Sequence, residues 1–217
     1  MKGLFISFEG TEGCGKSTQM VLLAERLRDQ GRTVRTLREP GGTPIGEEIR
    51  HTLKHSAVNQ AMMAETELLL MNASRAQLVR EIIQPALASG EIVLCDRFYD
   101  STTAYQGYGR QLDLGLVRTV IDIAAGATRP HLTLLLNVPQ EVSQQRLRAR
   151  QATLPFIRDR IEEADRSFFE RVAKGYQALA AAEPDRVRSI DASGSVQQVR
   201  EAIWELVAAG VRMKDEG

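Results

Sequence analysis

The chain has 217 residues, which is enough for one sizeable hydrophobic core. Hydrophobic residues make up 43% and charged residues 26%, the proportions of an ordinary soluble globular protein. Lys plus Arg and Asp plus Glu both number 28, so the formal net charge is zero, and this balance argues against a protein that coats nucleic acid or lies on a membrane surface.

The two cysteines do not form a disulfide framework. Cys14 lies in a glycine-rich loop and Cys95 in a predicted buried strand, which indicates a reducing compartment, and we expect a cytoplasmic location. We expect no signal peptide and no membrane span, because the first apolar run is short and continues straight into the loop.

The first predicted elements are a strand over residues 4–8 and a helix over residues 18–27. Between them stands Gly10-Thr11-Glu12-Gly13-Cys14-Gly15-Lys16-Ser17, which fits the pattern G-x-x-x-x-G-K-S. Glycines let successive N–H groups point at phosphate oxygens, and the helix N-terminus adds partial positive charge. The alternative is a glycine-rich turn without a ligand. The flanking strand and helix favour a phosphate site instead.

Two side chains of this loop have expected partners. Lys16 can reach the β- and γ-phosphates of a nucleotide, and the Ser17 hydroxyl can ligate Mg²⁺. We expect the whole stretch to hold the nucleotide, namely Gly10, Thr11, Glu12, Gly13, Cys14, Gly15, Lys16, Ser17 and Thr18.

The rest of the chain alternates strands with helices. Further strands are predicted over residues 33–37, 92–95, 132–138 and 187–190. Helices are predicted over residues 45–53, 62–88 (bent or interrupted at Pro85), 114–125, 141–150, 160–182 and 196–208. Residues 101–110, rich in hydroxyl, Tyr and Gly, receive no predicted element.

This alternation predicts the fold class. Right-handed crossovers between strands give a parallel sheet that is covered on both faces. We therefore expect an α/β fold, a P-loop NTPase three-layer sandwich with a five-stranded parallel sheet and helices on both faces. Because the sequence has no internal repeat, low-complexity segment or linker, we expect one domain over residues 1–217, with ligands at the carboxyl ends of the strands.

Two acidic residues stand where chemistry is expected. Asp96 follows the buried strand at 92–95, at the ligand edge of the sheet, where it could hold Mg²⁺ directly or through water, or orient an attacking oxygen. Its alternative role is a helix cap or a partner for Arg97. Glu12 lies inside the glycine-rich loop and would meet a metal, a water or a sugar hydroxyl; its alternative is a solvated loop residue.

Arginines supply the expected phosphate contacts, because the planar guanidinium fits phosphate oxygens. Arg50 and Arg97 are candidates for an acceptor phosphate. A second group of arginines lies on both sides of the predicted loop at residues 151–157: Arg146, Arg148, Arg150, Arg158 and Arg160. This arginine cluster predicts a lid at about 146–160 that closes over a triphosphate. The alternative for this group is a salt-bridged helix surface.

The chain resembles the thymidylate kinase family, its bacterial members in particular. The residues that carry the resemblance run in family order over nearly the whole chain: residues 8–18, Arg38-Glu39-Pro40-Gly41-Gly42-Thr43, Arg75, Asp96-Arg97-Phe98, Ala104-Tyr105-Gln106-Gly107 and Asp159-Arg160-Ile161-Glu162. The resemblance implies phosphorylation of dTMP to dTDP with ATP as donor and Mg²⁺ as cofactor. It also implies a homodimer.

The resemblance implies roles for residues of the acceptor site. Arg50 and Arg97 would hold the acceptor phosphate. Arg75 would hydrogen-bond the thymine, and the Thr102 hydroxyl would face the base. Tyr105 would crowd the position of a ribose 2′-hydroxyl, which favours deoxyribose.

Further residues of the shared motifs are expected at the substrate. Glu12 would act near the sugar and phosphate of the acceptor, and Glu39 and Gln106 would contact the substrate. The family commonly has an aromatic residue three or four positions before the base-binding arginine, where this chain has Met71 and Asn72. A thioether can lie flat against a ring, so Met71 is expected to take that place.

The resemblance also bears on the catalytic residues. One branch of the family carries a catalytic arginine in the phosphate loop and another supplies it from the lid. The variable loop positions here include no basic residue, so we expect the lid type, with Arg150 or Arg158 in that role beside Lys16, Glu12 and Asp96.

Two alternatives remain open. One is another nucleoside monophosphate kinase, acting on UMP, CMP, AMP or GMP. The other is a P-loop ATPase switch that hydrolyses ATP only when a partner protein is bound.

Overall fold

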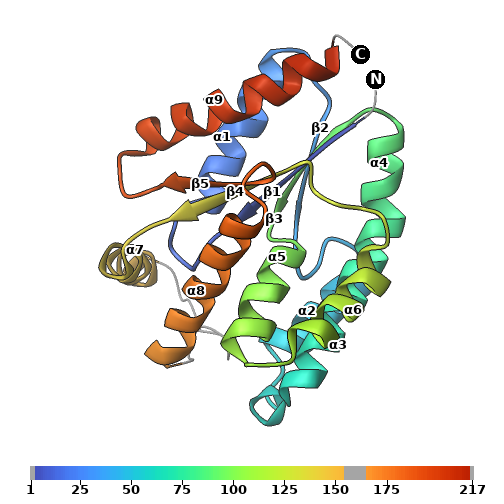
Figure 1. Cartoon of the computed structure of the whole chain (residues 1–217), viewed down its shortest axis with the longest axis vertical. Helices are drawn as coiled ribbons and strands as arrows, with labels where there is room; N and C mark the ends of the chain where they lie inside the picture. Colours follow the sequence, from blue (N-terminus) through green and yellow to red (C-terminus); the bar gives the residue numbers. More distant parts are fainter. Residues whose placement is uncertain (1–2, 154–164, 216–217) are drawn as a thin grey trace.

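The computed structural model describes residues 3–153 and 165–215, and its centre is a five-stranded parallel sheet (Figure 1). The strands are β1 (Leu4–Glu9), β2 (Val34–Arg38), β3 (Ile92–Asp96), β4 (Leu132–Asn137) and β5 (Val187–Asp191), in the order β2-β3-β1-β4-β5. The predicted α/β class and five-stranded parallel sheet are confirmed.

The sheet is covered on both faces because its central strands are apolar on both. On β1, Ile6 and Phe8 pack with α1 (Lys16–Asp29) and α9 (Val196–Asp215), which lie together on one face in Figure 1. Phe5 points the other way, into a cluster with α3 (Ala64–Leu78) and α6 (Leu114–Ala125). Leu135 of β4 continues this second face, against α8 (Arg166–Ala182). Continuous apolar strands are typical of a doubly covered parallel sheet.

The remaining helices are α2 (Pro44–Lys54), a short 3₁₀ turn (Asn59–Ala61), α4 (Gln84–Ala88), α5 (Tyr99–Thr102) and α7 (Gln140–Thr153). Helix α2 begins at the N-cap Thr43, whose hydroxyl accepts the Gly46 N–H at 2.9 Å. None of the helices in the described residues combines the length and the apolar composition that a membrane crossing requires.

The helix predicted over residues 62–88 is divided in the structure. Helix α3 ends at Leu78, a π-helical turn follows over Val79–Ile83, and α4 begins at Gln84. Pro85 lacks the N–H that would continue the α-helical hydrogen bonds, and the wider turn before it accommodates that loss.

Residues 101–109 are helical, although no element is predicted for the stretch 101–110. Helix α5 continues into a π-helical segment over Thr103–Gly109, which packs closely on α8. A Cβ at Gly109 would lie 2.6 Å from Cε2 of Phe168, so the glycine permits this approach. The packing buries Tyr105 and Gln106 next to the carboxyl ends of the strands.

Candidate active site

A cavity of about 490 Å³ lies at the carboxyl ends of β1 and β3. Its lining contains most of the predicted site residues: Glu12, Gly13, Gly15, Lys16, Ser17, Thr18, Glu39, Arg50, Met71, Arg75, Asp96, Arg97, Thr102, Tyr105 and Gln106. Cys14 instead packs into the apolar cluster between β1 and α1. Arg158 lies outside the described residues, and Arg150 is described only as part of helix α7.

The glycine-rich loop is built against α7. Gly13 has a φ of +73°, and a Cβ there would lie 2.8 Å from the Ser143 carbonyl oxygen. The Ser143 hydroxyl in turn donates to the Glu12 carbonyl oxygen at 2.5 Å. Helix α7, whose second half belongs to the predicted lid, therefore contacts the loop directly.

Lys16 is the first residue of α1 and its side chain turns back into the loop. The ammonium group donates to the carbonyl oxygens of Gly10, at 3.2 Å, and Thr11, at 3.0 Å. This places a buried cation at a helix N-terminus, the arrangement that binds phosphate.

Ser17 and Asp96 meet at the edge of the sheet. The Ser17 hydroxyl donates to Oδ2 of Asp96, the last residue of β3, at 2.8 Å. Both are oxygen donors of the kind that Mg²⁺ prefers. Within residues 3–153 and 165–215, no group of three or more His, Cys, Asp or Glu is arranged to hold a metal ion.

Arg97 is held from two sides. Its Nη2 group donates to Oε1 of Glu12 at 2.6 Å and to the Tyr105 hydroxyl at 3.1 Å. Its Nη1 group donates to the hydroxyls of Ser101, at 3.0 Å, and Tyr176, at 3.1 Å. A guanidinium fixed in this way has a defined direction at the cavity wall.

Glu12 is ionised in this setting. Burial alone would raise the pKa of its carboxyl, but the charges of Arg97, Lys16 and Lys54 outweigh burial and hold the pKa well below its ordinary value. The carboxylate therefore acts as an acceptor and offers no proton to a substrate.

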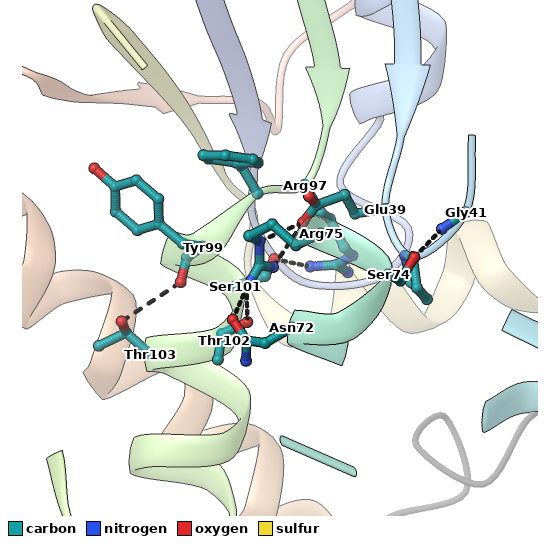
Figure 2. Close-up of polar contacts among 12 residues, drawn as sticks. Glu39, Gly41, Asn72, Ser74, Arg75, Arg97, Tyr99, Ser101, Thr102 and Thr103 are labelled. Carbon is teal, nitrogen blue, oxygen red and sulfur yellow. Dashed lines mark hydrogen bonds and ion pairs between the residues drawn. The ribbon is translucent and has the colours of Figure 1, made fainter. Parts of the chain in front are cut away.

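Arg75 and Glu39 form a buried ion pair on another wall of the cavity. Figure 2 shows Arg75 of α3 reaching Oε2 of Glu39, which follows β2, at 2.6 Å from Nη2. The Nη1 group donates to Oδ1 of Asn72 at 2.7 Å and to the Thr102 hydroxyl at 2.9 Å. Burial raises the pKa of Glu39, and the Arg75 charge opposes that rise. Thr102 thus contacts Arg75, the residue expected to recognise the base.

Other cavity residues have protein partners as well. Arg50 donates from Nη1 to the Pro40 carbonyl oxygen at 2.9 Å, and Gln106 donates to Oε1 of the buried Glu67 at 2.8 Å. Arg146 of α7 donates to the Ala192 carbonyl oxygen at 3.0 Å, which joins α7 to the end of β5. Met71 lies half-buried against the cluster that contains Tyr105.

Sequence reasoning gave no role to Glu9, which the structure places behind Arg97. Glu9 is fully buried, and its carboxylate accepts from the Phe98 N–H at 2.7 Å and from the Ser101 and Tyr176 hydroxyls at 2.5 and 2.8 Å. Burial, with the Asp100 charge second, raises its pKa to about 7 against the opposing charge of Arg97. The available signal was an acidic residue at the end of a strand that is apolar except for Ser7.

We expect the stability difference between the parent protein and Glu9→Gln to depend on pH. Between the ordinary pKa of 4.5 and about 7, the folded chain keeps a proton that the unfolded chain has released. Stability from this group therefore falls as pH rises, by about 3 kcal/mol over the window. Glutamine does not titrate, so the variant does not lose this stability as the pH rises. The difference in Tm, variant minus parent, should therefore increase from about pH 5 to about pH 8. A constant difference would contradict the raised pKa.

The comparisons with known proteins agree on one family. The family model described as thymidylate kinase matches residues 8–203. A thymidylate kinase of a Synechococcus strain is 48% identical over 204 residues, 94% of each chain, and one of Alcanivorax borkumensis is 47% identical over 95% of this chain and 97% of its own. The crystal structure of thymidylate kinase from Ehrlichia chaffeensis matches with a TM-score of 0.75 and 31% identity, over 95% of this chain and 99% of that chain.

Proposed function

The chain belongs to the thymidylate kinase family and catalyses the phosphorylation of dTMP to dTDP, and from this premise we propose that ATP and dTMP meet end to end in the cavity described above. The main support for the proposal is that Lys16 of the glycine-rich loop lines the same cavity as Arg50 and Arg97. The loop binds the donor phosphates and the arginines bind the acceptor phosphate.

On the donor side, backbone N–H groups of residues 10–18 and the Lys16 ammonium hold the ATP phosphates. The loop glycines and the N-terminus of α1 support this assignment, because both direct N–H groups and partial positive charge toward one point. As transfer proceeds, Lys16 neutralises charge that develops on the phosphate oxygens.

Ser17 and Asp96 are the residues that we propose to hold Mg²⁺. Their hydroxyl and carboxylate oxygens lie 2.8 Å apart, and one or two such protein ligands suffice because Mg²⁺ keeps several waters and binds phosphate oxygens. The ion supplies neutralisation of phosphate charge when bound.

On the acceptor side, we assign phosphate binding to Arg50 and Arg97, with Glu12 beside the sugar. Arg75 and Thr102 recognise the base, and Met71 packs on its face. Glu39 orients Arg75, which its short ion pair supports. Tyr105 and Gln106 complete the pocket, and the buried ring of Tyr105 discriminates against ribose.

Transfer is direct and in line. The attacking oxygen of the dTMP phosphate already carries negative charge, so the step requires no general base. Catalysis consists of positioning two nucleotides and neutralising charge between them. The low pKa of Glu12 fits this mechanism, because the carboxylate has no proton to exchange.

A panel of acceptors tests the assignment of the cavity. Purified protein is incubated with labelled ATP and dTMP, dUMP, UMP, CMP, AMP or GMP. We expect label on dTMP, with weaker transfer to the ribonucleotide UMP. Transfer to UMP as efficient as transfer to dTMP would refute the role of Tyr105. Hydrolysis of ATP without label on any nucleotide would favour the partner-dependent switch.

We propose that the whole chain forms one domain with a lid at about residues 146–160. Contact of α7 with the glycine-rich loop supports the lid, since closure there would act on the donor. Much of the predicted lid lies outside the described residues. The two free, buried cysteines support a reducing compartment, and on that ground we propose a cytoplasmic location.

We propose a homodimer formed through α2, α3 and α6. These adjacent helices and the residue before α3 expose large apolar side chains: Ile45, Met63, Leu69, Leu114, Leu116 and Ile123. Such a surface is typical of an interface. We expect Leu69→Glu to shift the sedimentation mass from dimer to monomer, whereas Val21→Glu, exposed on α1, leaves it unchanged. A monomeric parent protein would refute the proposal.

A further inference from the structure

We propose that Glu9 is a positioning residue for acceptor binding: its carboxylate fixes the backbone turn at Arg97 and sets the direction of the two hydroxyl groups that hold the Arg97 guanidinium. This inference rests on the proposed role of Arg97 in binding the acceptor phosphate. Glu9 does not line the cavity and is fully buried, so it acts on the substrate only through other residues.

The first part of the argument is the backbone turn at Arg97. Arg97 has a φ of +71°, in the left-handed region that non-glycine residues rarely adopt. Such a conformation persists only where neighbouring contacts hold it. The Arg97 N–H donates to the Phe8 carbonyl oxygen at 2.9 Å, and the next amide, that of Phe98, donates to Oε1 of Glu9 at 2.7 Å. One oxygen of Glu9 thus fixes the chain immediately after the strained residue.

The second part is the direction of two hydroxyl protons. The hydroxyls of Ser101 and Tyr176 both donate to Oε2 of Glu9. A hydroxyl has one proton, and the Glu9 carboxyl, once ionised above its pKa of about 7, can only accept. Once these protons point at Glu9, both oxygens present lone pairs, and both accept from Nη1 of Arg97. Burial and the Glu9 charge raise the pKa of Tyr176 well above its ordinary value, so its hydroxyl keeps the proton.

The third part is the charge around Glu9. Asp100, the other carboxylate whose charge acts on Glu9, is paired with Arg186 at 2.7 Å and also accepts from the Thr133 hydroxyl. Asp100 therefore has its own cation, whereas Arg97 is the arginine whose charge favours the ionised form of Glu9. The carboxylate of Glu9 is matched to Arg97 in charge as well as in geometry.

The substitution Glu9→Gln separates the two functions of the carboxylate. The amide oxygen can still accept the Phe98 N–H, but the NH₂ group replaces Oε2 and turns the Ser101 and Tyr176 protons toward Arg97. We expect KM for dTMP to rise by a factor of about 10 to 100, the effect of losing hydrogen bonds to a charged group. KM for ATP should stay within about twofold, because the described hydrogen bonds of the Glu9 side chain go to Phe98, Ser101 and Tyr176 and not to the glycine-rich loop that holds the donor.

A double-mutant cycle tests whether the effect passes through the hydroxyls. In a Ser101→Ala, Tyr176→Phe background, Glu9→Gln should change KM for dTMP by less than about twofold, because the two intermediary groups are already absent. Asp100→Asn is the matched control: it alters a neighbouring buried carboxylate that pairs with Arg186, and it should leave KM for dTMP unchanged.

The inference is overturned if a folded Glu9→Gln protein binds dTMP as the parent does while Arg97→Ala does not. It is also overturned if both KM values rise together with a fall in Tm, which is the result of a merely structural role. If Arg97→Ala itself leaves KM for dTMP unchanged, the proposed acceptor site fails instead. Should Glu9→Gln not fold, Tyr176→Phe with Ser101→Ala must still raise KM for dTMP alone.

Discussion

We expect Lys16→Ala to lose phosphoryl transfer, with kcat lower by a factor of at least about 10²–10³, while dTMP continues to bind. The reason is the place of Lys16 at the first position of α1, with its ammonium group turned into the concave side of the glycine-rich loop. Alanine keeps the helix and the backbone N–H groups. It removes the one cation of this loop, so charge that develops between donor and acceptor is less well neutralised.

The measurement separates catalysis from folding. Turnover is followed with saturating ATP and dTMP, Tm by thermal unfolding and dTMP affinity by calorimetry. Lys174→Ala serves as control, because Lys174 is exposed on α8 and lies outside the cavity lining. If Lys16→Ala retains kcat within a few-fold of the parent, the glycine-rich loop is not the donor site.

The sequence predicted those parts of the site whose signals are local. The glycine-rich loop, its preceding strand and its following helix lie within about thirty residues, and backbone conformation there follows from glycine and apolar spacing. Asp96 was predicted for a similar reason, since a residue after a buried parallel strand must lie at the ligand edge.

Glu9 was missed because its contacts are not local. Its partners Phe98, Ser101 and Tyr176 are 89, 92 and 167 positions away in the chain. The burial of a carboxylate at a strand end can be predicted only when the sheet order and the position of α8 are known. The same holds for the φ of Arg97, which the surrounding tertiary contacts impose on a residue type that does not favour it.

The π-helical segment over Thr103–Gly109 was missed for a different reason. Its sequence combines hydroxyl, aromatic and glycine residues, which give no helical period. Close packing on α8 stabilises it, as the near contacts of Gly109 with Phe168 and of Gly175 with Tyr108 show. Tertiary packing here overrides weak local preference, and it thereby sets where Tyr105 faces the cavity.

The second large effect is expected from the arginines of the proposed lid. Arg146 lines the cavity from α7, and Arg150 lies one helical turn further along the same helix. The glycine-rich loop carries no arginine at its variable positions, so a guanidinium that neutralises the transferred phosphoryl group must come from elsewhere. We expect that Arg150→Ala with Arg158→Ala lowers kcat by about 10³, the usual contribution of one arginine at this step.

The two single variants identify the residue that acts. The one that supplies the guanidinium should account for most of the loss in kcat, with KM for dTMP little changed, because the contact forms mainly in the transition state. Arg166→Ala is the matched control, since Arg166 is exposed at the start of α8 and pairs only with Glu170 among the described side chains. If the kcat of the double variant stays within a few-fold of the parent value, neither Arg150 nor Arg158 is the catalytic arginine. Lys16 and Arg146 would then be the residues that neutralise the charge of the transferred group.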